Sequence, residues 1–269
     1  MDLQLTGKRA LITGSSRGIG RAIAERLTRE GVRVIVHGLE EAECEETVHW
    51  IRRNGGDAHW VASDICTENG ITSLVTMARN TFGAIDILVN NAGGQTGTPG
   101  AQWEEVGIDD WLATYHLNVL SAVRLIHTFL PDMKAEKWGR IIQVASIAAS
   151  AALTAGPHYA AAKAALVNLT VTLTKALAGT GITVNTISPG SIVTPAFQNA
   201  YIARAALAGQ PCDWPSVEQA EVQKRQLAAG RLGAPEDIAD MVAYLVSPLA
   251  GYICGTNTRI DGGQSGFIN

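Results

Sequence analysis

Short apolar runs rich in β-branched residues alternate along most of the chain with longer segments in which apolar residues recur at helical spacing. The runs predict strands at Arg9–Thr13, Val32–His37, Ala58–Ser63, Ile85–Asn90, Arg140–Ala145, Thr183–Ser188 and Thr256–Ile260. The longer segments predict helices at Arg17–Glu30, Glu40–Asn54, Glu68–Phe82, Asp109–Ala135, Pro157–Ala178 and Pro235–Val246. Because the runs are apolar throughout, we expect an α/β fold with a doubly wound parallel sheet and helices on both faces.

One region departs from this alternation. Residues 194–230 carry Pro195, Pro211, Trp214 and Pro215 among helix-favouring alanines. We expect a long irregular insertion here, which in a compact domain is usually a functional lid or a mobile segment. Trp214 is a candidate either to line a substrate pocket or to anchor the segment against the core. Since no linker or shift in composition divides the chain, we expect residues 1–269 to form a single domain.

Composition narrows the class of protein. The chain has 269 residues, of which 46% are hydrophobic and 17% charged, with a net charge of -4. This balance is typical of a soluble globular protein and argues against a nucleic-acid or anionic-membrane binder, which needs a basic surface. The long uncharged stretches contain polar residues and proline, so we expect no membrane span, and the charged N-terminus predicts no export signal.

The positions of the cysteines and histidines bear on metal sites and disulfides. The four cysteines form no CxxC pair and the six histidines no HExxH spacing, so we expect no metal site and no disulfide framework. Reduced thiols are typical of the cytosol, and we expect a cytoplasmic protein.

A glycine-rich turn follows the first predicted strand. Its sequence is Thr13-Gly14-Ser15-Ser16-Arg17-Gly18-Ile19-Gly20, and it leads into a helix. Glycines allow a tight turn and a close approach to a pyrophosphate, while the helix N-terminus offers unpaired N–H groups. The spacing Gly-x3-Gly-x-Gly differs from the usual Gly-x-Gly-x-x-Gly, so its place at the first strand–helix junction carries the prediction of a dinucleotide site.

The end of the second strand bears on cofactor choice. An acidic residue there would bond the adenosine ribose and exclude a 2′-phosphate, but Val36-His37-Gly38-Leu39 contains none. Arg17 and His37 are candidates to face a 2′-phosphate, which favours NADP(H). Glu40 and Glu41 follow closely, so NAD(H) stays open as the alternative.

A phenol and an ammonium lie four residues apart in the predicted helix that begins at Pro157, at Tyr159 and Lys163. A tyrosine acting as acid–base near neutrality needs a pKa about 3 units below its usual value of about 10, and nearby cations supply such a shift. Ser146 follows the fifth strand, at the sheet edge where open α/β folds bind ligands. Asn118 is a poor choice for a helix interior unless it bonds something specific.

Together these motifs resemble the short-chain dehydrogenase/reductase (SDR) family over essentially the whole chain, and the look is closest to 3-oxoacyl-acyl-carrier-protein reductase-like members. The residues that carry the resemblance are Thr13–Gly20, Asn90-Asn91-Ala92-Gly93, Asn118, Ser146, Tyr159 with Lys163, and Pro189-Gly190. The resemblance implies a seven-stranded Rossmann sheet and a homotetramer.

The resemblance also implies roles. Tyr159 would be the general acid/base, Lys163 would bind the nicotinamide ribose and lower the pKa of Tyr159, Ser146 would polarise the carbonyl, and Asn118 would hold a relay water. The implied cofactor-binding residues are Gly14, Ser16, Arg17, Gly18, Ile19, Gly20, His37, Asp64, Ile65, Asn91, Ala92, Gly93, Tyr159, Lys163, Pro189, Gly190, Ile192 and Thr194.

We therefore predict an NADP(H)-dependent oxidoreductase that interconverts a small-molecule ketone and a secondary alcohol, with no nucleic-acid or membrane partner. Three alternatives remain: a 3-oxoacyl-thioester reductase, an NAD-dependent sugar, polyol or steroid dehydrogenase, and a nucleotide-sensing scaffold without chemistry. The long 194–230 segment argues against the thioester, and the complete Ser146, Tyr159 and Lys163 set argues against the scaffold.

Overall fold

The computed structural model describes residues 1–98, 100–151 and 155–266. Within them a seven-stranded parallel sheet runs in the order β3-β2-β1-β4-β5-β6-β7. The strands are β1 (Arg9–Ile12), β2 (Arg33–Gly38), β3 (Ala58–Ala62), β4 (Ile87–Asn90), β5 (Gly139–Val144), β6 (Ile182–Pro189) and β7 (Asn257–Ile260). Strand order reverses between β1 and β4, and the crevice at such a switch point is where open α/β sheets bind ligands.

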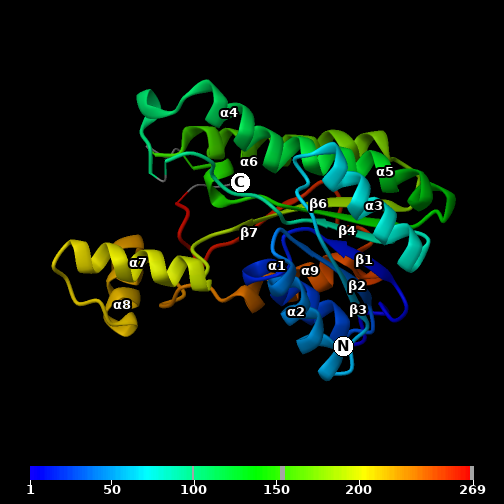
Figure 1. Ribbon diagram of the computed structural model, residues 1–269, viewed down its shortest axis with the longest axis horizontal. Coiled ribbons are helices and arrows are strands. Elements are labelled where there is room, and N and C mark those ends of the chain that lie inside the picture. The colour runs from blue at the N-terminus through cyan, green and yellow to red at the C-terminus, as the bar shows by residue number, and fades with distance from the viewer. Residues whose placement is uncertain (99, 152–154, 267–269) are drawn as a thin grey trace.

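Helices cover both faces of the sheet, as expected for strands that are apolar on both sides (Figure 1). One face carries α1 (Gly18–Arg29), α2 (Glu41–Arg53) and α9 (Pro235–Val246). The other face carries α3 (Glu68–Phe82), α5 (Ser121–Ala135) and α6 (Pro157–Ala176), with α4 (Ile108–Tyr115) leading into α5. The predicted doubly wound α/β architecture is thus confirmed.

The structure differs from the sequence prediction in the middle of the chain. The single helix expected at Asp109–Ala135 is interrupted by a π-helical turn at His116–Leu120 between α4 and α5. A π-turn inserts an extra residue into the helical repeat and is frequent at functional sites. The π-turn contains Asn118, which was singled out from sequence as poorly suited to a helix interior unless its side chain has a specific partner.

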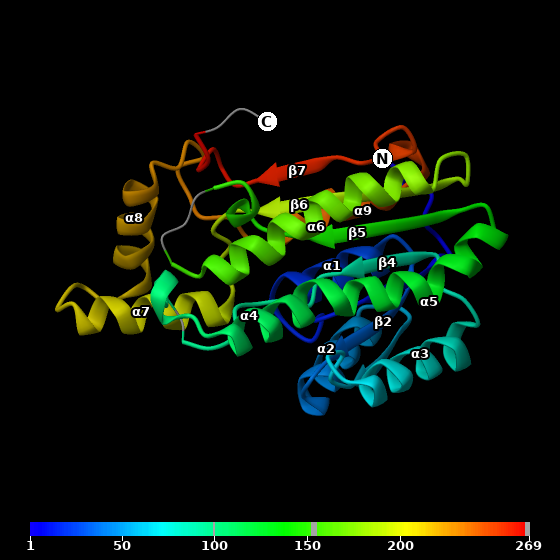
Figure 2. The same ribbon diagram turned by 90° about the horizontal axis from the view of Figure 1, so that it is seen from above.

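Residues 194–230 are not irregular, and this expectation was wrong. They form two helices, α7 (Pro195–Leu207) and α8 (Trp214–Arg225), that project from one end of the molecule (Figure 2). Each begins with a side-chain cap and a proline in its first turn, where proline is tolerated, so prolines that suggested breaks mark helix starts instead. We call these residues the α7–α8 hairpin.

The two ends of the α7–α8 hairpin meet in a short stretch of parallel pairing. Ile192 pairs with Gly233, through bonds from the Val193 N–H to the Gly233 carbonyl at 2.8 Å and from the Gly233 N–H to the Ser191 carbonyl at 3.0 Å. The chain therefore leaves and re-enters the body of the protein at adjacent points. No helix in the described part of the chain is both long and apolar enough to cross a membrane.

Candidate active site

The glycine turn between β1 and α1 is packed closely against the end of β4. Gly14 has φ +62°, and a Cβ there would lie 2.9 Å from the Ala92 Cα, so both the conformation and the space require glycine. The Asn91 amide donates to the carbonyls of Thr13 and Gly14, each at 2.9 Å. These bonds fix the turn at the switch point of the sheet.

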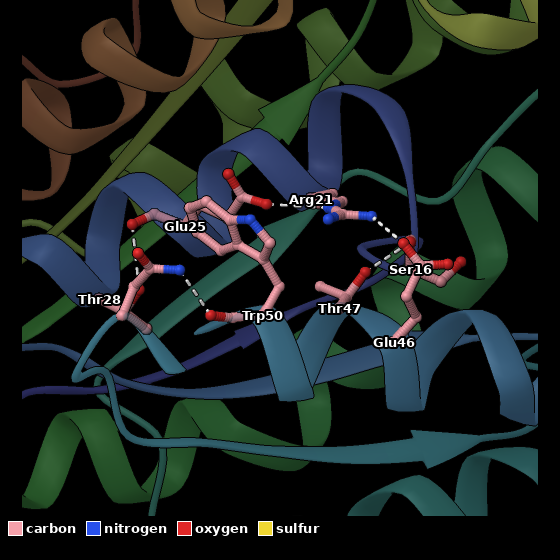
Figure 3. A network of polar contacts seen from close by, with 8 residues as sticks. Ser16, Arg21, Glu25, Thr28, Glu46, Thr47 and Trp50 are labelled. Carbon is pink, nitrogen blue, oxygen red and sulfur yellow. Dashed lines mark hydrogen bonds and ion pairs between the residues drawn. The ribbon is translucent and has the colours of Figure 1, made fainter. Parts of the chain in front are cut away.

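A polar network between α1 and α2 supports the same turn from outside. The Thr47 hydroxyl donates to the Ser16 carbonyl at 2.7 Å, and Arg21 joins Glu25 of its own helix to Glu46 of α2 (Figure 3). Because α1 starts directly after the turn, holding α1 against α2 also holds the direction of the N–H groups at its start.

A cavity of about 330 Å³ lies beside the turn, at the ends of β2 and β3. Its lining includes many of the expected cofactor residues: Gly14, Ser16, Arg17, His37, Asp64, Ile65, Asn91, Ala92 and Gly93. The sequence prediction therefore placed these residues around one hollow.

His37 serves this cavity through its hydrogen bonds. Its Nδ1 accepts from the Gly14 N–H at 3.2 Å, so Nε2 carries the proton that goes to the Ser63 carbonyl at 2.9 Å. Burial lowers the pKa of His37 to about 4, so the ring is neutral near pH 7. His37 lines the cavity as expected, but both ring nitrogens are already bonded to the backbone, so the neutral ring has no charge to offer a 2′-phosphate.

Arg17 lies at the mouth of the cavity with its side chain 72% exposed. Its guanidinium pairs with Glu43 at 2.8 Å, and the other oxygen of Glu43 accepts from the Ser16 hydroxyl at 3.1 Å. Sequence reasoning weighed Glu40 and Glu41 but missed Glu43. Glu43 could have been found from the predicted start of the helix, because it lies in the first turn of α2 and a side chain there points back toward the end of β2.

A second cavity, of about 730 Å³, is lined by three of the four catalytic residues expected from sequence, Ser146, Tyr159 and Lys163, whereas Asn118 is not in its lining. It also includes the expected Arg17, Ile19, Gly20, Asn91, Gly93, Pro189, Gly190, Ile192 and Thr194. Arg17, Asn91 and Gly93 line both cavities. The two hollows are therefore neighbours along the carboxyl edge of the sheet. Gly18 adjoins them, with a Cβ there reaching within 3.3 Å of Thr194.

Ser146 and Tyr159 line the same cavity. The Ser146 Oγ accepts from the Ala148 N–H at 3.2 Å, and its own hydroxyl proton remains to be donated. Burial raises the pKa of Tyr159, while the hydrogen bond with Ser146 lowers it, and the pKa stays above its usual value. The lowered pKa expected from sequence is thus not found in this structure, because desolvation outweighs the stabilisation of the phenolate.

Lys163 lies beneath Tyr159. Its Nζ is 5.6 Å from the Tyr159 ring centroid and donates to the Val144 carbonyl at 2.8 Å. The side chain is fully enclosed, and burial lowers the pKa of Lys163 to about 8. The ammonium is therefore held by the end of β5 and carries its proton at neutral pH.

Asn118 has the specific partners that its place in a helix required. From the π-turn its amide N–H groups donate to the carbonyls of Gly94 and Thr114, both at 2.8 Å, and its Oδ1 accepts from the Gly94 N–H at 3.1 Å. Asn118 thereby ties α4 to the loop after β4. It is 2% exposed, and a Cβ on Gly93 would lie 2.9 Å from the Lys163 Nζ, so the loop passes closely over the lysine.

The α7–α8 hairpin contributes side chains that sequence reasoning did not identify. Phe197, Tyr201 and Arg225 line the larger cavity, together with Gln264 near the C-terminus and Gln95 after β4. Trp214, the residue singled out from sequence, instead begins α8 and is half-buried. No local motif links these positions, because they approach one another only once the hairpin has folded. Across residues 1–98, 100–151 and 155–266 no cluster of potential metal ligands is found.

Comparison with known proteins adds the family. The model of the short chain dehydrogenase family matches residues 8–204. The chain is 34% identical over 262 residues to 3-oxoacyl-acyl-carrier-protein reductase of Vibrio cholerae, covering 97% of this chain and 99% of the relative.

Solved structures agree with this match. L-sorbose reductase from Gluconobacter frateurii, complexed with NADPH and L-sorbose, has a TM-score of 0.93 at 33% identity over 100% of both chains. A 7α-hydroxysteroid dehydrogenase complexed with NADH and a 7-oxo bile acid has a TM-score of 0.85 at 32% identity, covering 100% of this chain and 98% of the other.

Proposed function

Because this chain belongs to the short-chain dehydrogenase family, we propose that it transfers hydride between NADP(H) and a small ketone or secondary alcohol, with Tyr159 as acid–base. As a member of this family the chain is an NAD(P)-dependent oxidoreductase. The observation that carries the proposal is that Ser146, Tyr159 and Lys163 line one cavity, which also reaches the glycine turn at Arg17 and Gly20. A scaffold without chemistry would have no need of this arrangement.

The two neighbouring cavities fit a dinucleotide. The smaller lies at the ends of β2 and β3, where Asp64 and Ile65 would border an adenosine, and the larger reaches Pro189 and Gly190 at the end of β6. Between them the start of α1 and its unpaired N–H groups would face the pyrophosphate. Bound in this way, the reduced cofactor supplies the hydride.

The protein's own residues handle the oxygen of the substrate. The free proton of Ser146 would be donated to a carbonyl oxygen, which polarises the carbonyl for hydride attack. Tyr159 would then give its proton to the developing alkoxide. The raised pKa of Tyr159 keeps that proton on the phenol at neutral pH.

Lys163 and Asn118 support this proton transfer. The Lys163 ammonium would stabilise a tyrosinate once the proton has left, and its position below Gly93 also suits contact with a ribose. Asn118 would hold the loop that covers the lysine, and we propose that it also orders the water that returns a proton to the site.

NADP(H) is the cofactor that we propose. Arg17 is the exposed cation beside the adenosine end, and the sorbose reductase of similar structure was solved with NADPH. NAD(H) remains the alternative for two reasons. The Arg17 guanidinium is already paired with Glu43, and the steroid dehydrogenase of similar structure was solved with NADH.

Transfer of an isotopic label tests the proposal directly. The protein would be incubated with NADPH deuterated at the nicotinamide C4 and with a ketone, and the alcohol analysed by mass spectrometry. We expect deuterium on the carbinol carbon and no transfer with Tyr159→Phe. Binding of NADPH without label transfer to any ketone or thioester would overturn the proposal.

A second candidate is reduction of a 3-oxoacyl thioester, favoured by the similarity to the Vibrio cholerae reductase. Acetoacetyl thioesters on coenzyme A and on acyl carrier protein separate the two candidates. Efficient turnover of a thioester with poor turnover of free ketones would support this second function. The reverse result supports the first.

Assembly and location are further parts of the proposal. Ile108 and Leu112 of α4 are 74% and 64% exposed, and an apolar helix face of this kind suits burial against another copy. We propose a homotetramer in the cytoplasm, which sedimentation velocity at several concentrations and cell fractionation would test. A concentration-independent monomer would contradict the tetramer.

A further inference from the structure

Part of the wall of the larger cavity is made by residues that the catalytic mechanism leaves unused. Arg225 and Tyr201 come from the α7–α8 hairpin and Gln264 from the C-terminal segment. We call these three residues the distal wall. Their hydrogen bonds decide what kind of substrate the cavity accepts.

The acceptor atoms of the distal wall are already occupied. The Tyr201 oxygen accepts from Arg225 Nη2 at 2.7 Å, which leaves the tyrosine proton to donate. The Gln264 Oε1 accepts from the Ser191 hydroxyl at 3.0 Å and from its N–H at 3.3 Å, which leaves the Gln264 NH₂ group to donate. The wall therefore offers donors, and a ligand that satisfies them needs oxygen acceptors.

Arg225 adds to the unused donors. Its Nη2 serves Tyr201 and Glu221, while its Nε–H is buried without an acceptor among the described residues. A buried donor without a partner is costly. The Nε–H is enclosed and out of reach, but the Arg225 side chain is 19% exposed and lines the cavity, so an oxygen-rich ligand would bond the part of the guanidinium that is open to it.

The charge of Arg225 is nevertheless balanced. Glu221, one turn earlier on α8, lies 2.6 Å from Arg225 Nη2 and is itself 8% exposed. Glu221 approaches from a separate hollow between α7 and α8, so it neutralises the guanidinium from behind. Arg17, at the other end of the cavity, is likewise paired with Glu43. The distal wall is thus rich in donors but has little excess positive charge to hold a substrate anion, and the unpaired ammonium of Lys163 lies beside Tyr159, where the mechanism uses it.

We propose that the substrate is an electrically neutral ketone bearing hydroxyl groups, and that Arg225, Tyr201 and Gln264 select it. Hydroxyl oxygens accept from all three residues, and a neutral molecule does not compete with Glu221 for the guanidinium. A plain alkyl ketone would leave the donors unsatisfied, whereas a carboxylate at the distal wall would need a cation there that is not already paired. This inference rests on the proposed function, since it specifies the substrate of that same site.

Three ketones of four carbons separate these cases. Erythrulose is neutral and hydroxylated, butan-2-one has no hydroxyl, and acetoacetate is anionic. With NADPH we expect kcat/KM for erythrulose to exceed both others by at least about tenfold, the factor typical of a satisfied donor in a buried site. Equal or better turnover of butan-2-one or acetoacetate would overturn the inference while leaving the proposed hydride transfer intact.

Substitutions assign the selectivity to the distal wall. Arg225→Met should lower the erythrulose to butan-2-one ratio of kcat/KM by about tenfold, because it removes the donors at similar length. Glu221→Gln should shift the ratio toward acetoacetate by several-fold, because it exposes the charge of Arg225.

Arg204→Met is the matched control. Arg204 also lies over the Tyr201 ring, at 5.7 Å, but lines the hollow between α7 and α8 and not the larger cavity. We expect this variant to keep the wild-type ratio, with circular dichroism confirming the fold of all three variants. An unchanged ratio in Arg225→Met would refute the role of the distal wall. If neither the ketones nor the acetoacetyl thioesters are reduced, the proposed function fails and the inference falls with it.

Discussion

The proposed catalytic residues Ser146, Tyr159 and Lys163 share a cavity with the α7–α8 hairpin, yet the fold holds the two regions in different ways. Lys163 is buried and bonded to the Val144 carbonyl at the end of β5, and Asn118 is buried and bonded to the loop after β4. In the hairpin, by contrast, α7 buries only Ala205 and α8 only Val217 and Glu221. The residues proposed for the chemistry are thus held by the sheet and its loops, whereas those proposed for substrate contact lie mainly on two helices that bury few residues of their own.

This difference suits the two tasks. Hydride and proton transfer require distances held within fractions of an ångström, which buried side chains on strands and helices provide. Entry and release of substrate require movement, and elements with few buried contacts open at low free-energy cost. We call Asn118, Ser146, Tyr159 and Lys163 the sheet-anchored region. Substitutions in it should change the rate of catalysis, whereas substitutions in the hairpin should change substrate selectivity and the rates of substrate binding and release.

The largest effect should come from Tyr159→Phe. Removing the hydroxyl takes away the proton donor, and we expect kcat to fall by about 1,000-fold, within the range of general acid catalysis. The dissociation constant of NADPH, followed by its fluorescence, should change little. Retention of more than a tenth of wild-type kcat would show that the proton comes from elsewhere.

Hydrogen exchange compares the two regions directly. Amides of α8 should exchange at least about 100-fold faster than those of α9, which buries Ile238, Val242 and Val246 against the sheet. Mass spectrometry of peptic fragments measures this. Equal protection of the two helices would abolish the distinction drawn above.

The pH profile of ketone reduction should reflect Lys163. Its pKa near 8 lies below the usual value for lysine, so the ammonium is present below pH 8 and is lost as the pH rises through it. Because the pKa of Tyr159 is raised, its proton remains over this range. We therefore expect kcat/KM to fall by about tenfold per pH unit above pH 8. A flat profile to pH 10 would contradict a role for the lysine charge.

Asn118→Ala should lower both stability and rate. It leaves the Gly94 backbone groups and the Thr114 carbonyl without their side-chain partner, a loss of about 2 kcal/mol, and we expect a fall in kcat of about tenfold as the loop after β4 shifts. Ser121→Ala, which removes a hydroxyl bonded to Leu117 one turn away, serves as the control. Equal effects of both variants would reduce Asn118 to a helix-packing residue.

The smallest effect should come from Arg17→Met at the cofactor mouth. Because the guanidinium is exposed, its contact with a 2′-phosphate is screened by solvent, and we expect the dissociation constant of NADPH to rise about fivefold. The constant for NADH should rise less. Tighter binding of NADH than NADPH by the wild type would favour the alternative cofactor.

Much of the sheet-anchored region was predictable from sequence, because its signals are local. Apolar runs, glycines after a strand, and a tyrosine and lysine one turn apart each have a physical meaning over a few residues. The expected strands and helices accordingly lie within about two residues of those observed, apart from the π-turn. The π-turn could not be read in advance, since it depends on the bonds of Asn118 to a loop far away in sequence.

The hairpin and the electrostatics were not predictable in the same way. A proline in the first turn of a helix and a proline that breaks a helix look the same in the sequence, and only the fold distinguishes them. Likewise the pKa of Tyr159 depends on burial, which a count of nearby cations does not include. The residues of the distal wall lie on separate segments, so no spacing rule brings them together.

The pairing of Ile192 with Gly233 has a consequence for how such a protein could change over generations. Since the hairpin starts and finishes at one short ladder, a different pair of helices could be spliced between these anchor points while the sheet stays as it is. A change of substrate could thus come from exchanging the α7–α8 hairpin alone, while the residues proposed for hydride and proton transfer stay unchanged. Laboratory recombination of relatives at residues 192 and 233 is the corresponding engineering route.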